Sequence, residues 1–222
     1  MTEDDIPVSR PSKKDSENLH RVIYSPTQLG PEVTATQIWQ WIGTAFVYAE
    51  RLIKNQADFD HDAGGLFWIR LYGILVDLRA KFKSWKEVNE ALVYSPHPEV
   101  KEFQKRYFPS ALEWCTRAVE LINGLYISFS EEELIYIQYR RHVEAHPFQK
   151  SYEVQMGKNN KVIDKLPHAI LDNKVINREQ VHEILGRVLK QYKSERIIAV
   201  EFAKRSFPYL LQLHTLTTFL KR

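Results

Sequence analysis

The chain has 222 residues and a mass of 26.2 kDa, which suits one domain with a sizeable hydrophobic core. Its 44% hydrophobic and 27% charged residues are typical of a soluble globular protein, and no apolar run approaches the roughly 20 residues that a membrane span needs. The only cysteine, Cys115, excludes an intrachain disulfide and a cysteine-rich zinc site and favours a reducing compartment. We therefore expect a cytoplasmic protein with no membrane partner, and the polar start of the chain indicates no secretory signal.

The first part of the chain divides into a polar segment and a helix. Residues 1–30 are polar and interrupted by prolines, which predicts a flexible lead-in to a helical domain over residues 31–222. A first helix should begin near Thr34 or Thr36, because apolar residues recur at helical spacing from Ile38 to Ile53.

The acidic run Asp58-Phe59-Asp60-His61-Asp62 invites a metal-site interpretation. An EF-hand loop would need glycine at its sixth position and glutamate at its twelfth, where this chain has Ala63 and Ile69. The aspartates fit better as caps of the next helix, over residues 66–82. We therefore expect neither a metal nor another cofactor.

Four local signals predict the helices in the middle of the chain. Ser84 and Glu87 have capping-box spacing and should start a short helix through residue 92. Pro98 and Pro109 suit the first turns of two more helices, the second of which should stop at Gly124. Ser130-Glu131-Glu132-Glu133 is another capping box, and the helix that it opens should end before Pro147.

The last third of the chain begins with a segment whose sequence pattern is typical of strands and not of helices. Residues 152–156 and 161–164 flank Gly157-Lys158-Asn159-Asn160 and predict a small β-hairpin. Asn177 should cap a long helix that reaches residue 202, and Pro208 should start the last helix. The predicted fold is therefore all-α, an antiparallel up-and-down helical bundle with a small β-hairpin insertion.

The most informative stretch is Arg141-His142-Val143-Glu144-Ala145-His146, at the end of the helix that follows Ser130. At about 100° per residue, its cationic side chains share an arc with apolar residues, and charged groups facing a packed surface need a partner or a ligand. A structural explanation stands beside this one. Arg140, Arg141, His142 and His146 also occupy the helix end where cations complement the helix dipole.

The net charge of +3 is too small to establish a nucleic-acid partner, but its distribution is uneven. Residues 181–222 hold eight basic residues against three acidic ones. The basic residues are Arg187, Lys190, Lys193, Arg196, Lys204, Arg205, Lys221 and Arg222. This excess could guide a polyanion to a site elsewhere on the molecule, or it could be an ordinary solvated helix surface.

An all-helical protein of this size with Arg141-His142-x-x-x-His146 resembles the HEPN superfamily, whose pattern is an arginine, a polar residue and a histidine after a short interval. The resemblance implies a metal-independent ribonuclease of toxin, defence or RNA-processing systems, in which two motifs meet across a homodimer. It makes Arg141 and His146 the catalytic candidates and His142 and Arg140 the substrate-binding candidates. The implied partners are RNA or a nucleotide, a second copy of the chain and an antitoxin protein.

The chemistry of these residue types fits RNA cleavage by the 2′-hydroxyl. Histidine titrates near neutrality and can transfer a proton, while arginine binds phosphate oxygens in pairs. A single Arg–His pair stabilises limited charge, which favours two pairs facing each other across a two-fold axis. The alternative is a helical module that binds RNA or a nucleotide without cleaving it, because fold does not settle activity.

Overall fold

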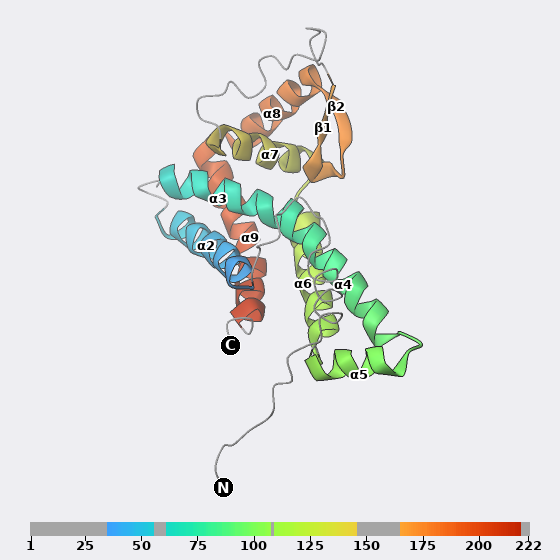
Figure 1. Ribbon diagram of the computed structural model, residues 1–222. Coiled ribbons are helices and arrows are strands. Elements are labelled where there is room, and N and C mark those ends of the chain that lie inside the picture. The colour runs from blue at the N-terminus through green and yellow to red at the C-terminus, as the bar shows by residue number, and fades with distance from the viewer. Residues whose placement is uncertain (1–34, 56–60, 108, 146–164, 219–222) are drawn as a thin grey trace.

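A computed structural model describes residues 35–55, 61–107, 109–145 and 165–218, and almost all of them are helical (Figure 1). The predicted all-α class is confirmed. The helices are α2 (Ala35–Lys54), α3 (His61–Gly73), α4 (Arg79–Val93), α5 (Pro98–Tyr107), α6 (Ala111–Ile127), α7 (Glu131–Ala145), α8 (Arg178–Tyr192) and α9 (Glu195–Thr218). A π-helical turn, η1 (Ile74–Leu78), joins α3 to α4. None of the described helices is long and apolar enough to cross a membrane.

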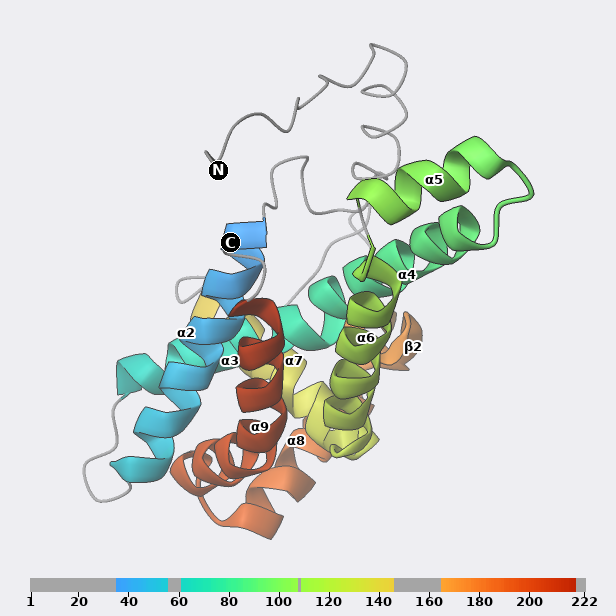
Figure 2. The same ribbon diagram turned by 90° about the horizontal axis from the view of Figure 1, so that it is seen from below.

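The hydrophobic core forms where α2, α3, α7 and α9 meet. Helix α2 lies along α9, and α3 packs against both α2 and α7 (Figure 1). Phe67 and Leu71 of α3, Tyr136 of α7 and Phe202 of α9 are buried in this core. Helix α6 joins the core to an arm made of α4 and α5, and it lies between α9 and α4 (Figure 2).

The break predicted at Ser84 is wrong, because α4 runs through this residue without interruption. The capping-box pattern of Ser84 and Glu87 is also compatible with a helix interior. Packing decides between the two: Phe82 is buried, with its ring 5.6 Å from that of Trp85 and 5.2 Å from that of Trp114 on α6. The helix therefore continues along α6 as far as Val93.

The stop predicted at Gly124 is also wrong, since α6 continues to Ile127. A Cβ atom at Gly124 would lie 2.8 Å from Cε1 of Tyr209 on α9, which is closer than real Cβ atoms come to other atoms. Gly124 therefore allows α6 to approach α9 closely and does not end the helix.

The chain between Asn177 and Thr218 folds as two helices with a different boundary from the predicted one. The cap is confirmed: Asn177 Oδ1 accepts from Gln180 N–H at 2.8 Å, and Gln180 Oε1 accepts from Asn177 N–H at 3.2 Å. However, α8 ends at Tyr192, where Lys193 takes a left-handed conformation with φ of 68°. Pro208 does not start a helix but lies inside α9, where Phe207 stacks on Phe46 of α2.

A small antiparallel hairpin is confirmed as part of the fold. Strand β1 (Lys165–His168) pairs with β2 (Lys174–Asn177) around a short 3-10 helix, η2 (Ala169–Leu171). Buried Ile170 and Ile176 attach the hairpin to the core. The predicted hairpin strands, residues 152–156 and 161–164, lie outside the described residues, as does the predicted lead-in over residues 1–30.

Candidate functional site

Helix α7, which carries the Arg141 motif, begins with the capping box predicted from the sequence. The Ser130 N–H donates to Glu133 Oε2 at 2.8 Å, and the Glu133 N–H donates to Ser130 Oγ at 3.3 Å. These two bonds satisfy backbone donors that the first turn of a helix leaves free. The beginning of α7 is therefore fixed by its own sequence.

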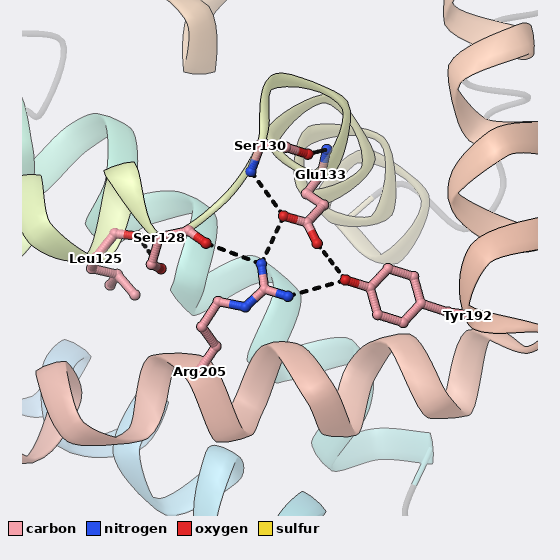
Figure 3. Close-up of polar contacts among 6 residues, drawn as sticks. All are labelled: Leu125, Ser128, Ser130, Glu133, Tyr192 and Arg205. Carbon is pink, nitrogen blue, oxygen red and sulfur yellow. Dashed lines mark hydrogen bonds and ion pairs between the residues drawn. The ribbon is translucent and has the colours of Figure 1, made fainter.

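Glu133 is also the centre of a polar network that joins α7 to α8 and α9 (Figure 3). Arg205 of α9 donates from Nη1 to Glu133 Oε2 at 2.7 Å and to the Ser128 carbonyl at 3.0 Å. Its Nη2 donates to the Tyr192 hydroxyl at 3.0 Å, and this hydroxyl donates to Glu133 Oε1. Because these groups satisfy one another, we assign this cluster, the Glu133 network, a structural role.

The Glu133 network predicts a pH-dependent contribution to stability. Burial alone would raise the pKa of Glu133, but hydrogen bonds from Arg205, Tyr192 and the Ser130 N–H outweigh it and hold the pKa below its usual value. A carboxyl group with a lowered folded-state pKa stabilises the fold above its unfolded pKa of about 4.3 and loses this contribution as the pH falls through the folded pKa.

We therefore expect the difference in the free energy of unfolding between wild type and Glu133→Gln to be constant near neutral pH and to shrink at acidic pH. Urea denaturation from about pH 7 down to about pH 3 measures it. The explanation fails if the difference grows as the pH falls.

Near the other end of α7, Arg140 is held by two carboxylates. Its side chain is only 16% exposed, and it pairs with Glu144 one turn later and with Glu195 of α9, where Nη1 lies 2.7 Å from Oε2. Burial tends to lower the pKa of Arg140, but Glu195, Tyr136 and Glu144 raise it above its usual value. Both terminal nitrogens are thus engaged, so substrate binding by Arg140 would require it to leave these partners.

Arg141, the next residue, lies in a different environment. Its guanidinium carbon lies 5.2 Å from the ring centroid of Tyr72 on α3, within the range of a cation–π contact. Burial raises the pKa of Asp77 in η1, and the charge of Arg141 opposes this shift. Among the described residues, none accepts a hydrogen bond from the Arg141 guanidinium or forms an ion pair with it within 4 Å. With respect to the described residues, its donors therefore remain available for an anion.

The structure describes only one of the two histidines of the motif. His142 is half-buried on the last turns of α7. His146 directly follows Ala145, the last residue of α7, and lies outside the described residues. The structure thus places Arg140, Arg141 and His142 on one helix end, while the Arg141–His146 pairing stays a prediction.

Sequence reasoning missed the two residues that surround Arg141. Both lie far from Arg141 in the chain: Tyr72 is near the end of α3, and Asp77 is in the π-helical turn η1 that follows it. Burial raises the pKa of the Tyr72 hydroxyl, with a smaller opposing effect from Arg141 and a further rise from Asp77. The one available signal was the charged Asp77 inside the apolar run Ile74-Leu75-Val76-Asp77-Leu78.

The metal interpretation of the acidic run finds no support in the described part of the chain. Asp58 and Asp60 lie outside the described residues, and no group of three or more potential ligand side chains gathers among the rest. Comparison with known proteins gives no assignment either. No protein-family model, curated protein or solved structure matches this chain.

Proposed function

We propose that this protein is a metal-independent endoribonuclease of the HEPN type, in which Arg141 binds the scissile phosphate and His146 transfers a proton. The observation that carries the proposal is the state of Arg141, whose guanidinium is held against Tyr72 but engages no protein acceptor among the described residues. Arginine can offer two parallel N–H donors to phosphate oxygens at any physiological pH. Arg141 is thus positioned by an aromatic face and remains able to bind an anion.

The contrast between the adjacent arginines supports this choice of residue. The terminal nitrogens of Arg140 pair with Glu144 and Glu195, and the second pair joins α7 to α9. Arg141 forms no such pair with any residue that the structure describes, although Asp77 is near enough to interact with it electrostatically. This difference predicts that Arg140 stabilises the fold and that Arg141 binds the substrate phosphate. His142 would be a second contact to the substrate.

A dimer completes the proposed chemistry. One arginine stabilises only part of the charge that develops on phosphorus, so a second copy would contribute a second Arg141 and His146 across a two-fold axis. Light scattering should give the mass of a homodimer at micromolar concentration, and a strict monomer would contradict the composite site. A ribonuclease of this kind would act in a toxin–antitoxin or defence system, restrained by an antitoxin protein.

The test of the proposal is RNA cleavage by the purified protein in the presence of a chelator. We expect Arg141→Ala to reduce the cleavage rate by at least about 100-fold, the typical cost of removing one group that stabilises transition-state charge. Arg141→Lys should recover only part of the rate, because an ammonium group cannot bind two oxygens in a planar fork. The matched control is Arg117→Ala, which removes an exposed arginine that pairs only with groups on the surface of α6 and α9.

The products distinguish the proposed mechanism from other activities. Attack by the 2′-hydroxyl leaves 2′,3′-cyclic phosphate ends, which end-group mapping detects. Cleavage that requires a divalent metal, or that survives Arg141→Ala, would overturn the proposal. RNA binding that depends on Arg141 without any cleavage would instead identify the non-catalytic binding module.

A further inference from the structure

The structure divides the basic residues of the C-terminal region into paired and unpaired groups. Arg205 belongs to the Glu133 network, Arg187 pairs with Glu132 and Glu183, and Lys204 pairs with Glu201. Lys221 and Arg222 lie outside the described residues. The remaining three are Lys190, Lys193 and Arg196, which surround the connection between α8 and α9. We call these three residues the basic turn.

The basic turn presents three charges to solvent. All three side chains are exposed, and no acidic side chain of the described residues lies within 4 Å of them. Glu195, the acid between Lys193 and Arg196, is engaged by Arg140. Lys193 also has a φ of 68°, a conformation that costs a residue other than glycine roughly 1–2 kcal/mol. The turn therefore keeps a lysine where glycine or asparagine would fit the backbone better.

The basic turn lies beside the end of α7 that carries Arg141. The Arg140–Glu195 ion pair, at 2.7 Å, joins this end of α7 to the first residue of α9. Arg196 follows Glu195 directly, and Arg141 follows Arg140 directly. Figure 1 shows the start of α9 next to the C-terminal end of α7. The basic turn and the end of α7 that carries Arg141 are thus neighbouring segments of the fold.

We propose that the basic turn binds the phosphate backbone of single-stranded RNA and leads the strand across the end of α7 to Arg141. This inference rests on the proposed function, since it takes RNA as the ligand of Arg141. Lysine and arginine side chains on a surface bind phosphates largely as point charges, and such binding releases counterions without reading the base sequence. The basic turn accordingly increases affinity for any single strand and leaves cleavage specificity to the residues near Arg141.

The salt dependence of binding tests this surface separately from catalysis. The probe is a fluorescent single-stranded RNA with 2′-O-methyl riboses, which the proposed mechanism cannot cleave, and anisotropy gives its Kd over a range of salt concentrations. The variant is Lys190→Gln/Lys193→Asn/Arg196→Gln, in which asparagine suits the left-handed backbone at position 193. The slope of log K against log salt is negative, and each lost phosphate contact on a single strand reduces its magnitude by about 0.7, so the three substitutions should reduce the magnitude by about 2.

The matched control removes the same charge elsewhere. Lys83→Gln/Lys101→Gln/Lys105→Gln replaces three exposed lysines on α4 and α5, in the arm on the other side of the molecule. Its salt slope should stay within about 0.7 of the wild-type value, the equivalent of one phosphate contact. Circular dichroism checks that both triple variants keep the helical fold.

The outcomes separate this inference from the proposed nuclease. A triple variant of the basic turn that binds with the wild-type slope, or that loses no more than the control, overturns the RNA surface even if the wild type cleaves RNA. A slope of smaller magnitude in this triple variant, without any cleavage by the wild type, supports the surface and contradicts the nuclease. A wild type that does not bind the probe at low salt overturns the surface as well.

Discussion

Replacing His146 by alanine should slow RNA cleavage by about 10²- to 10⁴-fold, the usual contribution of a general acid or base. An imidazole with a pKa near 6.5 can accept a proton from the 2′-hydroxyl or donate one to the leaving oxygen at neutral pH, and alanine can do neither. His142→Ala should have a milder effect if His142 only positions the substrate. Single-turnover cleavage of a labelled RNA in chelator measures both variants.

Two controls make the His146 result interpretable. The variant should keep the wild-type helical signal and the wild-type mass in light scattering, because His146 follows the last residue of α7. A loss smaller than about tenfold would contradict a role in proton transfer. A loss in His142→Ala that equals the loss in His146→Ala would contradict the assigned division between the two histidines.

Replacing Glu133 by alanine should lower the free energy of unfolding by about 3 kcal/mol, the low end of the range for breaking a buried ion pair. Glu133 is 6% exposed, and its loss leaves Arg205 and the Tyr192 hydroxyl without their common acceptor. It also removes the acceptor of the Ser130 N–H at the start of α7. We choose the low end because the Arg205 side chain is 31% exposed and can turn toward water. Urea denaturation at neutral pH measures the change.

The neighbouring residue provides the control for Glu133. Glu132→Ala removes a carboxylate from the same helical turn, but its pair with Arg187 is exposed, so it should cost at most about 1 kcal/mol. Equal losses in the two variants would show that the first turn of α7 needs negative charge in general. In that case the Glu133 network would not be the source of stability.

Local signals in the sequence predicted the beginnings of α7 and α8 correctly. Ser130 and Asn177 cap α7 and α8 as expected, because a cap depends on residues within one turn. The errors arise where contacts between helices decide the boundary. Ser84 and Gly124 look like helix boundaries, yet the helices continue: Trp114 of α6 packs on Phe82, two residues before Ser84, and Tyr209 of α9 lies against Gly124. Contacts of this kind, between residues far apart in the chain, cannot be predicted from a short stretch of sequence.

The candidate site shows the same division between local and remote information. The sequence located Arg141 near the end of a helix, since both capping and periodicity are local. It could not predict that Arg140 would find Glu195, or that Tyr72 would lie against Arg141, because these partners come from elsewhere in the chain. Adjacent arginines therefore looked equivalent until their neighbours were known.

The π-helical turn accommodates one extra residue in the middle of a continuous helix. Each residue of an α-helix turns the chain by about 100°, and a π turn holds roughly one residue more than an α turn. Phe67, before η1, is buried in the core, and Phe82, after η1, packs against Trp114 of α6. Deleting one residue from η1 would therefore restore a regular helix and leave both rings near their present faces. The extra residue lies in the segment that carries Asp77, whose carboxyl group interacts electrostatically with Arg141.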